Sequence, residues 1–459
     1  MFFWVDIIFI NRNIYFFIFK IFVILIDYNF INLSMNLIKN RPIFLIEILY
    51  LLIPISLVFS IAVSELFLNI IVIFFIIYSL KYKIFYYYKN RFFIFFIFFF
   101  IYLILVSLIK NNEVPISVLF FFRFGLFALS AWFLLDNNKN LIRLMMTSIF
   151  ITYSIISADA IFQFFYGINL MGVPYDILVQ PRLSGFFKDE LILGSYLSRL
   201  SPLILLQLGL FMSEIKTNTS LRYFMACVFL FFFSFVIFAS GERVSFIYFL
   251  ISSIFFLLFL KSIIKSFLVI LSCALAFLLI NSNSESRLIK TTILQIQGSL
   301  TNSDRGKFEL KEFNQIPIPH LHHWKATILM AKENIFFGVG PRMFRVECKN
   351  PRYAVPNGCA THPHSIYFQL LGETGIIGFI SIFSFFFYIL IKIIINFRKN
   401  NSFKLKNKTT LAFFSLSCLF LHFFPFLPNG NFFNNWLNII TFIPMGIFLY
   451  SNHSNSRYD

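Results

Sequence analysis

The sequence predicts an all-α polytopic membrane protein with about twelve transmembrane helices and one large loop on the outer face. Of its 459 residues, 59% are hydrophobic and only 13% are charged. Apolar runs of roughly eighteen residues or more recur along the whole chain, which excludes a single soluble core. Lysine and arginine gather in alternate joints between these runs, and one long polar stretch, residues 281–363, interrupts them.

The first 34 residues permit three interpretations. Ile14–Ile26 is apolar except for Lys20 and is short for a membrane span. No small-residue cleavage site follows it, so we expect no cleavable signal peptide. Residues 1–34 are therefore an amphipathic anchor, an extra span or the product of a misassigned start codon. We favour the last, because Met35 and the basic residues after it resemble a cytoplasmic start.

Residues 35–280 are expected to form nine transmembrane helices, and residues 364–450 three more. Residues 451–459 would then be a cytoplasmic tail. The predicted spans are 43–62, 63–80, 92–109, 115–135, 141–162, 191–211, 222–239, 244–260, 262–280, 364–391, 409–427 and 433–450.

The distribution of basic residues orients these spans. The chain has a formal net charge of +18, which could indicate nucleic-acid binding. Most of that charge, however, lies in alternate joints, as the positive-inside rule requires of cytoplasmic loops. These joints contain Lys39 and Arg41, Lys81 to Arg91, Lys139 and Arg143, Lys216 and Arg222, Lys261 and Lys265, and Lys392 to Lys408. The opposite joints carry few charges, so the polar stretch 281–363 is predicted to face outward.

Two arginines stand out among the few outward charges. Arg182 lies in Arg182-Leu183-Ser184-Gly185-Phe186, and Arg243 in the tight turn Ser240-Gly241-Glu242-Arg243. An isolated arginine at such a place would simply reach to the lipid headgroups. Two of them, beside glycine and serine that allow close backbone approach, favour a pyrophosphate at the membrane surface, because guanidinium matches phosphate oxygens.

The outward histidines divide into two groups. His320, His322 and His323 lack a recognisable metal-ligand spacing, and His322 and His323 cannot share one helical face, so we expect no metal there and no cofactor. His362 and His364 directly precede an apolar run, which predicts that His364 lies at the water–lipid boundary. Histidine there suits proton transfer or phosphate binding, but a merely structural role remains equally open.

The remaining features of the outward stretch are a helix and a pair of cysteines. Trp324, Ile328 and Ala331 have helical spacing and predict an amphipathic helix on the membrane face. Cys348 and Cys359 are close in sequence, and in an oxidising compartment we expect them to form a disulfide. The other three cysteines lie in apolar runs, and we expect them to pack there as small apolar side chains.

Taken in order, these segments resemble the O-antigen ligase and polymerase superfamily of bacterial inner membranes, from about Met35 to Tyr450. The similarity rests on four segments and on the position of the large loop between the ninth and tenth spans. The segments are Arg182 to Phe186, Ser240 to Arg243, Trp324 through Gly338-Val339-Gly340-Pro341 to Phe344, and His362-Pro363-His364-Ser365 to Tyr367 followed by Glu373 to Gly378. One residue departs from the pattern: the family usually has Asn where this chain has Ser365.

The resemblance implies a GT-C-like fold in the inner membrane with a periplasmic loop. It also implies transfer of a glycan from undecaprenyl pyrophosphate to an acceptor hydroxyl, without a metal. Arg182 and Arg243 would hold the pyrophosphate. His364 would either accept the hydroxyl proton or contact the pyrophosphate, and Glu242, Asp189 and His362 are secondary candidates.

The acceptor and even the class of activity have alternatives. Lipid A–core as acceptor gives a ligase, which we rank slightly first. A second lipid-linked glycan gives a polymerase, and a protein hydroxyl, ranked well behind, gives an oligosaccharyltransferase. A transporter of the lipid-linked glycan is the competing class, but the charges gather at the outward joints and not at mid-membrane.

Overall fold

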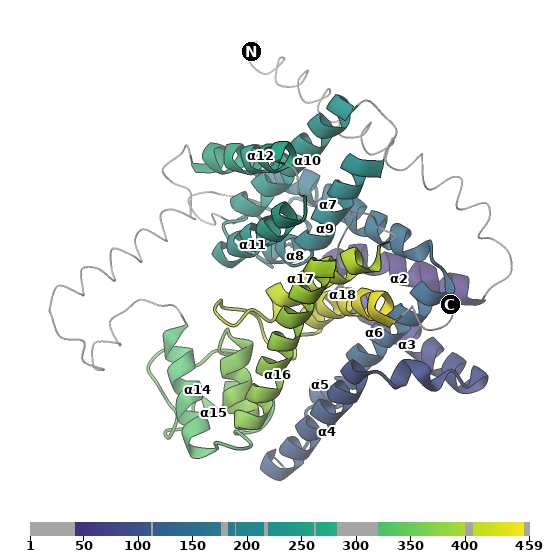
Figure 1. Cartoon of the computed structure of the whole chain (residues 1–459). Helices are drawn as coiled ribbons and strands as arrows, with labels where there is room; N and C mark the ends of the chain where they lie inside the picture. The colour runs from purple at the N-terminus through teal and green to yellow at the C-terminus, as the bar shows by residue number, and fades with distance from the viewer. Residues whose placement is uncertain are drawn as a thin grey trace.

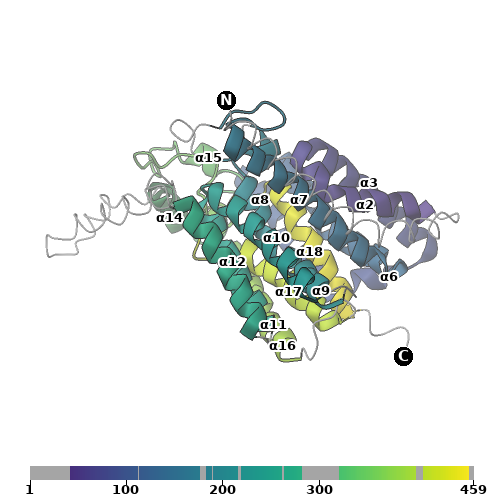
Figure 2. The same ribbon diagram turned by 90° about the horizontal axis from the view of Figure 1, so that it is seen from above.

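The structure is a computed structural model that describes residues 42–111, 113–175, 182–188, 190–214, 219–260, 263–281, 320–399 and 407–453. These ranges form helices and connecting turns without a β-strand, and an isolated bridge pairs Ile168 with Pro174. The long helices run side by side as one bundle, and α14 and α15 lie at one end of it (Figure 1, Figure 2). Residues 1–34, 282–319 and 454–459 lie outside the described ranges.

Helices appear where the apolar runs predict them. The first half of the chain contains α2 (Pro42–Phe59), α3 (Ile61–Tyr82), η1 (Phe85–Tyr88), α4 (Arg91–Asn111), α5 (Ile116–Leu119), α6 (Phe122–Asn137), α7 (Leu141–Tyr166), η2 (Gly185–Phe187), α8 (Leu193–Arg199) and α9 (Ser201–Glu214). The second half contains α10 (Thr219–Ala239), α11 (Arg243–Leu260), α12 (Ile263–Asn281), α14 (Leu321–Glu333), α15 (Phe344–Glu347), α16 (Ile366–Lys399), α17 (Lys408–His422) and α18 (Asn435–His453).

By length and composition, 5 helices of the described ranges are able to cross a membrane. They are Ile61–Tyr82, Arg91–Asn111, Ile116–Asn137, Leu141–Tyr166 and Ile366–Lys399. Shorter apolar helices accompany them, so the protein is all-helical and membrane-like, while the count of twelve spans stays a prediction. The predicted span 191–211 is not one helix, because the chain breaks at Leu200 between α8 and α9.

The helices differ in how much of their surface the protein itself covers. In α5 and α6 together, 78% of the most apolar stretch of 18 residues is buried inside the protein. In α3 and in α16 the corresponding share is 28%. Nearly every residue of α17 and α18 is also buried. An apolar helix with an exposed apolar face suits contact with lipid. We infer that α6, α17 and α18 form the interior and that α3 and α16 face the bilayer.

Helix α16 is interrupted at Gly375, which has φ 67° and ψ −168° and divides it into two pieces. The first piece, Ile366–Thr374, packs against α14 and the turn that follows it (Figure 1). Two backbone bonds join them, from Val339 N–H to Gly372 O and from Gly340 N–H to Glu373 O. A third, from Ile376 N–H to Ile335 O, lies just after the break. The predicted span 364–391 is therefore not one continuous helix. The Gly338-Val339-Gly340 turn serves to dock α14 on α16.

Helix α14 confirms the helix predicted from Trp324, Ile328 and Ala331, but its buried face differs. Ala326 and Met330 are fully buried, and Ile328 is 38% exposed. Trp324 stacks on Phe368 of α16 with 4.9 Å between ring centroids. The helix thus packs against α16 through Trp324, and its predicted position on the membrane face stays a prediction.

Candidate active site

Arg182 and Glu242 form an ion pair between two loops that are distant in sequence. Arg182 Nη2 lies 3.4 Å from Glu242 Oε1 and also donates to Leu191 O at 2.7 Å. Glu242 Oε1 accepts Gly194 N–H, and Oε2 accepts the Ser245 hydroxyl. Both carboxylate oxygens are therefore engaged, and they tie the Arg182 loop to the turn that begins α11.

The loop that follows Arg182 is held from helix α7. Gln163 Oε1 accepts the backbone N–H groups of Ser184 and Gly185, and Asn169 donates to Gly185 O. Gln163 is fully buried, so its bonds fix this loop within the protein. Sequence reasoning did not identify Gln163, because a single polar residue in an apolar helix carries no motif.

Arg243 is the first residue of α11 and lies near a cluster of imidazoles. The charge of Arg243 contributes to lowering the pKa of His320, after burial and the neighbouring His323. The His320 ring stacks on the His364 ring at 4.3 Å between centroids, and the His362 ring lies 4.2 Å from that of His364. The structure thus brings the arginine turn and the histidines together.

Four features position His364 at the start of α16. Its backbone is left-handed, with φ 55°, which is uncommon outside glycine. Asn429, from the loop between α17 and α18, donates its N–H to His364 O and accepts Ile366 N–H on Oδ1. Trp324 donates its indole N–H to Pro363 O at 2.9 Å. Ser365 is buried and its hydroxyl accepts Phe368 N–H, so here the residue after His364 caps the helix.

Burial makes these histidines hard to protonate. It lowers the pKa of His364 to about 3, with help from His362, His320 and His323. It also lowers the pKa of His362 to about 4. Because a positive charge is poorly solvated there, both rings are neutral near pH 7. Burial raises the pKa of Glu242, and the Arg182 guanidinium opposes that rise.

A disulfide joins Cys348, which follows α15, to Cys359. The Cα atoms are 5.2 Å apart, and the loop between them contains the turn Pro356-Asn357-Gly358. Gly358 O contacts the His323 ring at Nδ1, 3.0 Å away. The disulfide therefore fixes a segment that holds one ring of the histidine cluster.

Arg199 is a buried cation that sequence reasoning missed. It ends α8, is 4% exposed, and donates to His422 Nδ1 at 3.2 Å and to Ser195 Oγ at 3.1 Å. Its guanidinium also lies 5.4 Å from the Tyr248 ring centroid. The charge of Arg199 acts on Glu242, so it belongs to the same polar region. Its position inside an apolar run was the available signal, because such charges usually mark functional sites.

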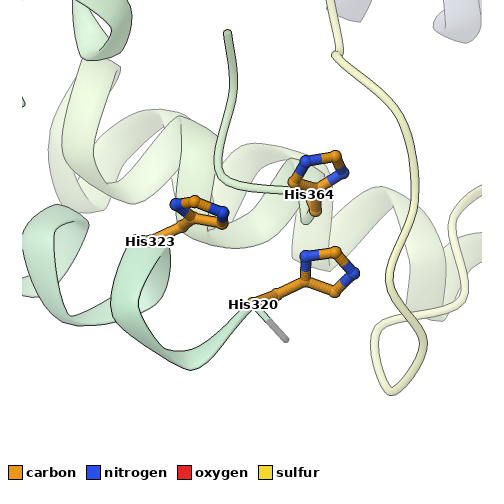
Figure 3. A group of neighbouring side chains, drawn as sticks. All are labelled: His320, His323 and His364. Carbon is orange, nitrogen blue, oxygen red and sulfur yellow. The ribbon is translucent and has the colours of Figure 1, made fainter. Parts of the chain in front are cut away.

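The predicted residues Arg182, Glu242, Arg243, His362 and His364 thus belong to one connected region of the structure. Asp189 lies outside the described residues. His320, His322 and His323 form one group by sequence spacing, whereas the structure places His320 and His323 with His364 (Figure 3).

Comparison with known proteins gives a family match. Residues 228–383 match a family model described as O-antigen ligase. The matched range contains Glu242, Arg243 and all the clustered histidines. No curated protein matches the chain.

Proposed function

We propose that this protein, a member of the O-antigen ligase and polymerase superfamily by its match over residues 228–383, is a glycan transferase. It would move a glycan from undecaprenyl pyrophosphate to an acceptor hydroxyl outside the membrane. An O-antigen ligase or polymerase type of activity follows from the family match. The observation that carries the finer proposal is the juxtaposition of the Arg182–Glu242 pair, Arg243 and the histidine cluster.

Arg182 and Arg243 are proposed to bind the pyrophosphate of the donor. Arg182 Nε is buried and has no hydrogen-bond partner among the described residues, although Nη2 is engaged. A buried donor without a partner costs free energy that an anionic ligand would recover. Fixed guanidinium groups also stabilise the negative charge that develops on a leaving pyrophosphate.

His364 is proposed to accept the proton of the acceptor hydroxyl. The hydroxyl oxygen forms a bond to the anomeric carbon, and the bond from that carbon to the pyrophosphate oxygen breaks. The bonding electrons leave with undecaprenyl pyrophosphate, and the hydroxyl proton moves to the ring nitrogen of His364 that carries the lone pair. The lowered pKa keeps this ring neutral near pH 7 in the free protein, and the negative charge of a bound pyrophosphate would raise that pKa and so strengthen the ring as a base.

Glu242 is proposed to position Arg182 and the α11 turn, and not to act as the base. Each of its oxygens already accepts a hydrogen bond, and Oε1 also pairs with Arg182. A carboxylate with all these partners would have to break the ion pair before accepting a proton from substrate.

Lipid A–core is the proposed acceptor, which makes the protein an inner-membrane ligase with its polar loop in the periplasm. A polymerase would use the same residues with a second lipid-linked glycan, and a protein oligosaccharyltransferase would use them with a serine or threonine. A transporter of the lipid-linked glycan is the alternative from a different class, and the assay described next distinguishes it from the transferase.

The test is transfer by the purified full-length protein with a lipid-linked glycan, in chelator, with lipid A–core supplied or omitted. Glycan on lipid A–core supports the ligase, and longer lipid-linked chains without an acceptor indicate the polymerase. We expect Arg182→Ala, Arg243→Ala and His364→Ala each to lower the rate by roughly 100-fold or more, the scale of losing a group that stabilises or deprotonates at the reacting centre.

Matched controls are Arg352→Ala and His322→Ala, which change the same residue types outside the site and should transfer at the wild-type rate. Full activity in the His364→Ala variant would exclude the proposed base. If the lipid-linked glycan crosses liposome membranes and no glycan is transferred, the protein is a transporter and not a transferase.

A further inference from the structure

Three imidazoles converge where α14 begins and where the chain enters α16. His320 is the N-cap residue of α14, His323 lies in the first turn, and His364 comes from the other side of the space between them (Figure 3). One ring nitrogen from each lies within 4.8 Å of the other two. His320 and His323 are three positions apart, so they lie on the same side of the helix.

The surroundings leave ring nitrogens of this cluster available. His323 Nδ1 lies 3.0 Å from Gly358 O and donates its proton there, which leaves the lone pair on Nε2. Ligand histidines usually make such a bond through their other nitrogen, because it fixes the tautomer and the ring orientation. His320 Nδ1 is buried without a hydrogen-bond partner in the described part of the chain, so it also has no competing contact.

The backbone around the cluster is held in place from several directions. The Cys348–Cys359 disulfide adjoins Gly358, Trp324 bonds to Pro363 O, and Asn429 bonds to His364 O. A site that is preorganised in this way loses little conformational entropy when a ligand binds.

From this geometry we propose that His320, His323 and His364 bind a divalent cation of the zinc class. Neutral imidazole nitrogens suit Zn²⁺ and its neighbours, whereas Mg²⁺ and Ca²⁺ require oxygen ligands. Tetrahedral Zn²⁺ with bonds of about 2.0–2.1 Å holds its ligand nitrogens roughly 3.3 Å apart, so the three nitrogens, which lie within 4.8 Å of one another, would move closer together when the cation binds. A bound cation would occupy the His364 lone pair that the proposed transfer requires, so Zn²⁺ at this site would inhibit transfer and take no part in it.

The spacing of His320, His322 and His323 predicted no such site, because it offered His322 as the third ligand. His322 follows His320 by two positions and points to a different side of α14. The third ligand is instead His364, 41 residues after His323 in sequence. His322 is therefore a natural control, of the same residue type and one position from a ligand.

The experiment measures Zn²⁺ binding calorimetrically on full-length protein in detergent, stripped with chelator and purified without a polyhistidine tag. No glycan is present, so the result does not depend on the proposed transfer activity. We expect one Zn²⁺ per chain, with affinity lowered at least 10-fold in His320→Ala and His323→Ala and changed less than 3-fold in His322→Ala. With Co²⁺ in place of Zn²⁺, a tetrahedral absorption spectrum should appear in the wild type and be absent from the first two variants.

The proposal fails if the wild type binds no Zn²⁺, or if His320→Ala and His323→Ala bind it as the wild type does. It also fails if His322→Ala loses binding to the same extent. Because the alanine variants could misfold, His320→Gln and His323→Gln provide a second pair. Any variant used must melt as a single transition and keep Cys348 and Cys359 protected from thiol reagents.

Discussion

At the residue scale, the proton affinity of His364 is set by its neighbours. His320, His323 and His362 surround the ring, Arg243 of α11 acts on His320, and Arg345 acts on His362. Every one of these groups is neutral or positive. Protonation of His364 is therefore opposed both by burial and by the charge that its neighbours carry or would acquire.

This environment predicts an unusual pH profile for kcat/KM, which reports groups of the free enzyme. The proton-accepting form of His364 is lost only near its pKa of about 3. Between pH 8 and pH 5.5 kcat/KM should change less than about 2-fold, whereas a histidine with the ordinary pKa of about 6.5 would lose about 90% of its neutral form.

The profile should be measured in chelator, so that no metal occupies the ring, with His322→Ala as the control. A fall in kcat/KM centred near pH 6.5 in both proteins would show that the reacting base is exposed to water, and would exclude His364 in the environment described here.

At the element scale, the break in α16 depends on a conformation that only glycine tolerates. Gly375 has φ 67° and ψ −168°, a region from which other residues are essentially absent. A Cβ there would also lie 2.3 Å from Phe336 C and O. Substitution therefore strains the backbone and separates α14 from α16.

We predict that Gly375→Ala destabilises the protein by more than about 3 kcal/mol and displaces His364. Gly172→Ala is the matched control, because Gly172 also has positive φ (+78°) but a Cβ there would meet nothing within 4 Å. It should cost about 1 kcal/mol. Thermal unfolding in detergent compares them; equal losses would mean that the contact with Phe336 contributes nothing.

The disulfide is a second device at this scale. The cysteines are 11 residues apart, and closing so short a loop typically contributes about 2–3 kcal/mol. Cys348→Ala and Cys359→Ala, singly and together, should lower the melting temperature equally, whereas Cys227→Ala in α10 should not. If thiol reagents label both cysteines in intact, unreduced cells, the pair is not bonded in the native protein.

At the scale of the whole molecule, the distribution of basic residues predicts which ends of the helices face outward. The joint between α6 and α7 is expected inside, and the joint between α17 and α18 outside. In a variant without Cys227, Cys273 and Cys418, Lys139→Cys should resist a membrane-impermeant thiol reagent in intact cells. Phe426→Cys, whose wild-type side chain is 82% exposed, should react. The reverse pattern would place the histidine cluster in the cytoplasm.

Sequence patterns predicted the helices well, because apolar runs and basic joints are local signals. The interruptions at Leu200 and Gly375 were not predicted, because such breaks depend on contacts between segments that are distant in sequence. The same limit applies to the site. Arg182, Arg243 and His364 were identified singly, but the Arg182–Glu242 pair and the partnership of His320 with His364 exist only once the chain has folded.

The glycines that dock α14 on α16 lead to an expectation about how relatives of this protein vary. A Cβ at Gly338 or at Gly375 would meet only backbone atoms, so no smaller neighbour could compensate for a substitution. A Cβ at Gly372 would instead meet the Thr327 methyl, Cγ2, at 2.5 Å. In an alignment of relatives, we therefore expect glycine at positions 338 and 375 whatever residues surround them. Alanine at position 372 should occur only together with serine or glycine at position 327.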